Sequence, residues 1–143
     1  MKLEVTRLDE GLFLPAYARS GDAALDLMSS EDVQLKPGER AAIATGLAVA
    51  IPEGHAGFVH ARSGRSLREG LALVNAPGLI DAGYRGEIKV ILVNLDSSDV
   101  IHIARGEKIA QLVVQAVERV ELVEVEELPG SERGAGGFGS TGR

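Results

Sequence analysis

Short apolar segments separated by turn-forming residues make up most of this chain, and helical periodicity is nearly absent. The breaks between the segments are rich in Pro, Gly, Asp and Ser, as in Pro37-Gly38-Glu39 and Asp96-Ser97-Ser98, and these residues favour tight turns. Only Ser63–Glu69 has a composition compatible with one or two helical turns. The pattern predicts about ten short strands, at Leu3–Thr6, Ala24–Met28, Val33–Leu35, Arg40–Ile51, Gly57–Ala61, Leu71–Val74, Glu87–Asn94, Val100–Ile103, Lys108–Val120 and Leu122–Glu126.

So many strands in 143 residues predict one all-β domain, built as a sandwich, jelly roll or barrel. The composition changes at Pro129-Gly130: six of the 14 residues from Gly130 to Arg143 are glycine, and Phe138 is the only large apolar side chain there. Such a segment cannot bury enough apolar surface to fold alone. We therefore divide the chain into a β domain at residues 1–129 and a flexible arm at residues 130–143.

Composition and charge narrow the function classes. The formal net charge of −6 is unlike that of a generic nucleic-acid-binding domain, and the lack of cysteine excludes disulfides and thiolate chemistry. The N-terminal residues are too charged for a signal peptide, and the most apolar stretch, Val90–Val93, is far shorter than the ~20 residues that span a bilayer. We expect a cytoplasmic protein that binds no nucleic acid polymer and no membrane, with a core built mainly from Val, Ile, Leu and Ala.

Three segments combine residue types that can bind or transform a ligand. The run Arg62-Ser63-Gly64-Arg65-Ser66 offers backbone amides and guanidinium groups to an anion, or it is a surface turn with two solvated arginines. The stretch from Asn75 to Ile88 is expected to form a long hairpin. In it, Asp81 follows apolar residues and could be a partly sheltered general base, or simply a turn former. The amide of Asn75 can both donate and accept hydrogen bonds, as the edge of a pyrimidine requires.

Asp26 lies in a predicted strand between Leu25 and Leu27, and the alternation of a strand directs its side chain opposite to theirs. A metal, a charge partner or plain solvent exposure would each explain an Asp there. The glycine-rich arm contains a formal G-x-G-x-x-G pattern, but no helix follows it, so it does not indicate a dinucleotide fold. Its Arg133, Phe138 and Ser140 suit a phosphate and a planar base, unless the arm is only a disordered terminus.

In order along the chain, five segments resemble the motifs of the trimeric deoxyuridine triphosphatase (dUTPase) family. They extend from about residue 20 to residue 142. Any one of them could arise by chance, whereas five in the same order form a specific pattern. The segments are Ala24–Leu27, Arg62–Gly64, Gly78–Glu87, Arg105–Leu112 and Arg133–Gly142.

The resemblance implies hydrolysis of dUTP to dUMP and pyrophosphate, by attack of water on the α-phosphorus with Mg²⁺ on the triphosphate. This activity limits uracil incorporation into DNA and supplies dUMP for dTMP synthesis. The resemblance also implies an all-β jelly-roll or distorted β-barrel subunit in a homotrimer, with active sites shared between subunits.

The resemblance also implies roles for individual residues. Asp81 matches the catalytic residue that activates water, and Tyr84 matches the ring that packs under the deoxyribose and excludes a ribose 2′-hydroxyl. Asp26 matches a carboxylate that holds the metal through water, and Gln111 matches a position that holds an ordered water. The resemblance further implies that Arg62, Ser63 and Gly64 bind the phosphates, and that Asn75, Gly78, Leu79 and Ile80 bind the uracil. Lys89 is a further implied substrate-binding residue. Arg133, Phe138, Gly139 and Ser140 belong to an arm that closes over the nucleotide, with Phe138 on the base and Arg133 on the γ-phosphate.

Two positions depart from the usual family pattern. Gly83 stands where a second Asp is frequent, and Arg65 stands where a small or apolar residue is usual. Arg65 is therefore expected either to contact the triphosphate or to face water. Two other functions remain open on the same scaffold: a dCTP deaminase that uses Glu87, and a non-catalytic nucleotide sensor.

Overall fold

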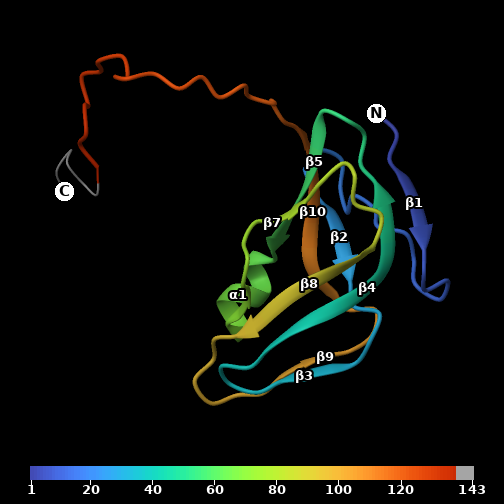
Figure 1. Cartoon of the computed structure of the whole chain (residues 1–143). Coiled ribbons are helices and arrows are strands. Elements are labelled where there is room, and N and C mark those ends of the chain that lie inside the picture. The colour runs from blue at the N-terminus through green and yellow to red at the C-terminus, as the bar shows by residue number, and fades with distance from the viewer. Residues whose placement is uncertain (138–143) are drawn as a thin grey trace.

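The computed structural model describes residues 1–137, so the predicted contacts of Phe138, Gly139 and Ser140 lie outside it. Within these residues the chain forms two four-stranded antiparallel sheets, one two-stranded ribbon and one short helix (Figure 1). The first sheet has the order β1 (Glu4–Arg7), β4 (Arg40–Ala50), β8 (Glu87–Asn94), β6 (Leu71–Leu73). The second has the order β2 (Leu25–Met28), β10 (Lys108–Ala116), β5 (His55–Ala61), β7 (Gly78–Ile80). The ribbon pairs β3 (Val33–Leu35) with β9 (Ile101–Ile103), and the helix α1 is Ser63–Glu69.

These elements confirm the all-β prediction. The helix has the predicted bounds, as do β3 and β8. Most other strands differ from the predicted ranges by one or two residues at an end. No helix in the described part of the chain is long and apolar enough to cross a membrane.

One apolar cluster with members from both sheets forms the core. In β8 alternate side chains point inward, so Ile88, Val90 and Leu92 are almost fully buried. They meet Leu27 of β2 and Leu112 of β10 in the same cluster. The buried members of the cluster are Leu, Ile, Val and Ala only, which confirms the core composition expected from the scarcity of aromatic residues.

A bulge in β4 provides a hydrogen bond to Glu87, at the end of the loop that follows Asp81. The pairing of β4 with β8 shifts register between Ala44 and Ala48, and Gly46 at this point has φ +66°. A side chain on Gly46 would lie 2.7 Å from Asp9 Cβ, so glycine is required there both by backbone geometry and by space. The freed backbone N–H of Gly46 donates to Glu87 Oε1 at 2.9 Å, which anchors the start of β8.

The hairpin expected over Asn75–Ile88 forms, with one strand more than predicted. Its flanking strands β6 and β8 pair with each other in the first sheet. Between them, β7 pairs with β5 in the second sheet, where Leu79 lies opposite Phe58. The three residues of β7 contain a glycine and follow a proline, which is why the apolar pattern alone did not mark them as a strand.

The predicted strand Leu122–Glu126 is wrong, and the last predicted strand is too long. β10 ends at Ala116, opposite His55, the first residue of its partner β5. A final backbone hydrogen bond joins Val117 N–H to Gly54 O, and beyond it the chain leaves the body as an extended segment (Figure 1). Apolar alternation therefore continues past residue 116 without a neighbouring strand in the described chain to pair with.

Candidate active site

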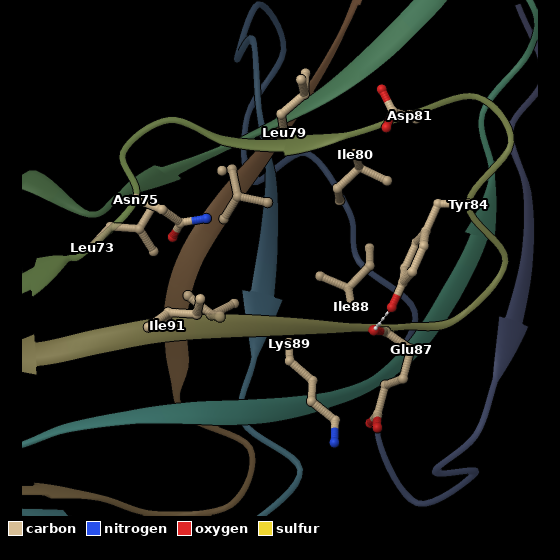
Figure 2. A pocket seen from close by; sticks show the side chains of 13 residues that line it. Leu73, Asn75, Leu79, Ile80, Asp81, Tyr84, Glu87, Ile88, Lys89 and Ile91 are labelled. Atoms are coloured by element: carbon tan, nitrogen blue, oxygen red, sulfur yellow. Dashed lines mark hydrogen bonds between the residues drawn. The ribbon is translucent and has the colours of Figure 1, made fainter.

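A cavity of about 600 Å³ opens between β7 and β8 (Figure 2). Its walls include the buried side chains of Ile80, Ile88 and Val90. Asn75 lies at one end of the cavity, and Asp81 and Tyr84 lie at the other. A slot with buried aliphatic side chains in its walls and polar groups at its two ends is the form of site that binds and orients a flat ligand with polar edges.

At the Asn75 end, the absence of a side chain on Gly78 leaves room for the neighbouring side chains of Val59 and Asn75. A Cβ on this buried glycine would lie 3.3 Å from Val59 Cβ and 3.5 Å from Asn75 Nδ2. Asn75 itself is exposed, and its amide points into the space between the strands (Figure 2). Leu79 is 60% exposed at the rim, which leaves it free to contact a bound ligand. These four predicted residues, Asn75, Gly78, Leu79 and Ile80, are thus brought together as expected.

Asp81 is placed at the mouth of the cavity, but it is not sheltered. β7 ends at Ile80, and the chain then turns, with Tyr84 N–H donating to Asp81 O at 3.0 Å. Ile80 points into the core, so the next residue projects outward, and the Asp81 side chain is exposed. The expectation of a partly buried carboxylate is therefore wrong for the single chain, because residues 1–137 of the same chain do not cover this position.

The loop after Asp81 is braced by its own polar groups. Tyr84 Oη donates to the carbonyl oxygen of Glu87 at 2.9 Å. Arg85 Nη1 donates to the carbonyl oxygens of Ala82 and Tyr84, at 2.6 and 2.8 Å. The Tyr84 ring is thereby held across the end of the cavity, between Asp81 and β8 (Figure 2).

Two charged side chains at the border of the cavity do not point into it. Lys89 lies on β8 and is exposed, and its ammonium group points away from the space between the strands in Figure 2. The carboxylate of Glu87 also points away, because Oε1 accepts the hydrogen bond from Gly46. A direct role of Glu87 in the cavity, as a deaminase would need, is disfavoured by this geometry.

The phosphate-binding residues expected from the sequence lie elsewhere, at the start of α1. Arg62 precedes the helix, Ser63 is exposed in its first turn, and Gly64 lies beside the Arg68 side chain. Arg62 is not a free cation: its Nε lies 3.3 Å from Asp26 Oδ1.

Asp26 is the centre of a charged cluster on the second sheet. Only 8% of Asp26 is exposed, and its Oδ2 accepts a hydrogen bond from Lys108 Nζ at 2.7 Å. Gln111 on β10 lies directly opposite Asp26 on β2. Asp26 therefore has a charge partner, one of the three explanations considered for it, in the form of the two cations Arg62 and Lys108. The alternation of β2 alone could not distinguish this explanation from solvent exposure.

Asp26 also retains an unused buried oxygen. Its Oδ1 lies within ion-pair distance of Arg62, yet it makes no aligned hydrogen bond. No group of three or more acidic or histidine side chains in residues 1–137 could enclose a metal. One carboxylate with a spare oxygen fits Mg²⁺ that is held mainly by substrate phosphates and water, and it does not fit a cage formed by protein alone.

The predicted site residues thus form two separate groups in one chain. The cavity group comprises Asn75, Gly78, Leu79, Ile80, Asp81, Tyr84 and Lys89. Arg62, Ser63, Gly64, Gln111 and Asp26 do not line that cavity. Arg133 is exposed on the extended C-terminal segment and belongs to neither group.

Arg65 has a role that sequence reasoning missed. Its guanidinium makes hydrogen bonds to both oxygens of Glu69, including one of 2.7 Å from Nη2 to Oε2, and Nη1 lies 3.3 Å from Glu107 Oε2. The side chain is only 11% exposed. Arg65 therefore neither faces water nor extends toward a ligand; it ties α1 to the turn before β10. The i,i+4 spacing of Arg65 and Glu69 is the signal that could have indicated part of this contact.

A second ion pair fastens the same turn to the N-terminal loop. Arg105 Nη2 lies 2.7 Å from Asp9 Oδ1, and its hydrogen bonds hold the pKa of the Asp9 carboxyl below its usual value. Because the folded-state pKa is lowered, this pair is intact above the ordinary pKa of an aspartate and is lost as the pH falls through the lowered value.

Comparison with known proteins gives one consistent result. The model of the dUTPase family matches residues 12–142. A deoxyuridine 5′-triphosphate nucleotidohydrolase of Thermobifida fusca is 58% identical over 99% of this chain and 79% of its own length. One of Mycolicibacterium gilvum is 57% identical over 98% of this chain and 94% of its own length.

Solved structures agree with these sequences. The dUTPase of Staphylococcus bacteriophage 80alpha with dUPNHPP is 35% identical, covers 99% of both chains and superposes with a TM-score of 0.92. A mutant dUTPase of S. aureus phage phi11, described for its coordination of a structural Mg(II) ion, is 34% identical over 89% of this chain and 98% of its own, with a TM-score of 0.81.

The Arg65 contact predicts a local effect on α1. Replacing Arg65 by Met removes the cation that faces Glu69 and Glu107. We expect the amide hydrogens of α1 to exchange with solvent at least about tenfold faster, because hydrogen bonds to charged groups contribute roughly 1.5–3 kcal/mol. Hydrogen exchange followed by mass spectrometry gives this rate. Arg68→Met, which removes an exposed cation from the same helix, is the matched control; equal rates in the two variants would contradict the assignment.

Proposed function

Because the chain belongs to the dUTPase family, we propose that it hydrolyses dUTP to dUMP and pyrophosphate. The observation that carries this proposal is the slot between β7 and β8, with an amide at one end and a carboxylate beside a tyrosine ring at the other (Figure 2). The polar groups at its ends correspond to a base at the Asn75 end and a sugar and α-phosphate at the Asp81 end.

Uracil is selected at the Asn75 end. The Asn75 amide and nearby backbone groups of β7 match the O4 and N3–H of uracil. A cytosine would present N4–H₂ to the same groups and leave buried polar atoms unpaired, which is a strong basis for discrimination. The side chain of Val59 lines the slot beside Gly78, and we expect this wall to leave no room for the 5-methyl group of thymine.

At the opposite end, Asp81 orients and deprotonates the water that attacks the α-phosphorus. Its exposed carboxylate at the mouth of the slot is accessible to both water and the phosphate chain. Tyr84 lies beneath the deoxyribose. Hydrolysis of the α–β anhydride then releases pyrophosphate and leaves dUMP in the slot.

The phosphates are bound by Arg62, Ser63 and Gly64, with Gln111 holding an ordered water. Since these residues do not line the slot of their own chain, we propose that they come from a second copy, in a homotrimer with shared active sites. In a closed symmetric ring each copy gives one group of residues and receives the other. The acidic chain cannot attract a triphosphate over long distances, so Arg62 and the polar groups beside it carry the binding.

Asp26 is the residue that would hold Mg²⁺, through a water on Oδ1, which makes no hydrogen bond of its own. Bound to the triphosphate, the ion neutralises part of its negative charge and polarises the phosphoryl oxygens. Arg62 and Lys108 flank Asp26 and balance its charge before substrate arrives.

Residues 130–143 serve as a lid, distinct from the β domain at residues 1–129. The exposed course of the chain after β10 supports this division. Arg133 reaches the γ-phosphate when the lid closes, and closure excludes water other than the nucleophile. Phe138, Gly139 and Ser140 enter this proposal from their motif alone.

Release of pyrophosphate from dUTP tests the proposed activity directly. With Mg²⁺ present, we expect one pyrophosphate for each dUMP formed, little turnover of dTTP, and no ammonia from dCTP. Ammonia from dCTP would support the deaminase alternative. Binding of dUTP without pyrophosphate release would support the sensor.

The role of Asp81 predicts the behaviour of Asp81→Asn. This variant keeps the size of the side chain but cannot accept a proton, so turnover of dUTP should fall at least about a hundredfold. Binding of a non-hydrolysable dUTP analogue, measured by calorimetry, should remain. Asp99→Asn changes an exposed aspartate away from the cavity and is expected to retain full turnover. Near-normal turnover by Asp81→Asn would contradict the assignment.

The lid predicts a second effect. Truncation after Leu128 should leave the thermal unfolding curve of the β domain nearly unchanged, because the removed residues that are described lie almost entirely exposed. The value of kcat/KM for dUTP should fall about a hundredfold or more, as expected when groups that position the substrate are lost. Unchanged kinetics would identify residues 129–143 as a terminus without a part in the reaction.

A further inference from the structure

The ring of Tyr84 occupies the space in which a side chain on residue 86 would stand. A Cβ on Gly86 would lie 2.5 Å from Tyr84 Oη, 2.7 Å from Cζ and 3.1 Å from Cε2. Ordinary contacts of a Cβ are 3.4–4 Å. The observed position of the ring is therefore compatible with glycine alone at residue 86.

The backbone does not impose this glycine. The φ angle of Gly86 lies outside the left-handed region, unlike that of Gly46 or Gly106. An alanine at residue 86 can adopt the same backbone conformation. What excludes it is the aromatic ring, and the ring is the part that would move, since Tyr84 is 45% exposed and is not locked in the core.

Because Gly86 has no side chain, the Tyr84 ring can occupy its observed position at the end of the cavity. Tyr84 lies between Asp81 and β8, and its hydroxyl donates to the carbonyl oxygen of Glu87 (Figure 2). A methyl group on residue 86 would displace the ring from this position by about 1 Å, the difference between its contact distance and the normal one. That shift is on the scale of a hydroxyl group, which is the difference between a ribose and a deoxyribose.

We propose that Gly86 is a specificity-positioning residue, which acts through Tyr84 to keep ribonucleotides out of the site. The proposal rests on the proposed function, because it requires the sugar of dUTP to lie against Tyr84. Gly86 itself needs no contact with the nucleotide. Its missing side chain lets the ring lie where a 2′-hydroxyl would otherwise fit.

The test compares dUTP with UTP in Gly86→Ala. We expect the ratio of kcat/KM for dUTP to that for UTP to fall about tenfold or more, the usual scale for a pocket altered by one small group. A general loss of folded enzyme cancels in this ratio. Gly83→Ala is the matched control from the same loop, because a Cβ on Gly83 meets nothing within 4 Å in the described chain, and its ratio should stay at the wild-type value.

Two further variants separate steric positioning from other effects. In a Tyr84→Ala background, adding Gly86→Ala should change the ratio no further, since the residue acts only through the ring. Tyr84→Phe retains a ring over Gly86 and should keep the ratio within about threefold of wild type, whether or not Gly86→Ala folds. An unchanged ratio in Gly86→Ala, an equal fall in the Tyr84→Ala background, or loss of discrimination in Tyr84→Phe overturns the inference. If wild-type protein releases no pyrophosphate from dUTP, it is the proposed function that fails.

Discussion

β7 and β8, the two strands joined by the loop that contains Asp81, belong to opposite sheets, and the candidate site depends on this constraint. β7 pairs with β5, whereas β8 pairs with β4 and β6. Because each strand has its backbone hydrogen bonds satisfied by a different sheet, the two strands cannot close on each other as a simple hairpin would. A slot between them is the result. The polar residues at its two ends are placed by strands that are fixed in the body of the protein, and only the loop from Asp81 to Gly86 is held by its own hydrogen bonds.

Much of this arrangement could be predicted from the sequence, because alternation and turn residues are local signals. β8 and α1 have the bounds that their patterns indicate. The end of β10 could not be predicted in the same way. Apolar residues continue beyond Ala116, but the partner strand does not, and a strand needs both. The same reasoning explains the exposed course of residues 122–126: their alternating pattern is suited to a sheet that residues 1–137 of this chain do not supply.

The same distinction applies to the site residues: contacts between residues close in sequence could be predicted, and contacts between distant segments could not. The motif around Asp81 predicted the residues that meet in the slot, since they are close in sequence. It did not predict that Asp81 is exposed or that the Glu87 carboxylate turns away to Gly46. The neutralisation of Asp26 on β2 depends on Lys108 of β10 and on Arg62 before α1, which are all distant from one another in sequence. Such contacts appear only when the topology is known.

The position of β10 has a consequence for how the protein is made. This strand lies between β2 and β5 in its sheet, yet both partners precede it by a long stretch of chain. During synthesis, β2 and β5 are therefore both made before residues 108–116, the strand that pairs with each of them. Contacts so distant in sequence form slowly because closing a long loop costs chain entropy. The second sheet is thus completed only after most of the chain has been synthesised, and until then the edges of β2 and β5 that pair with β10 have no partner.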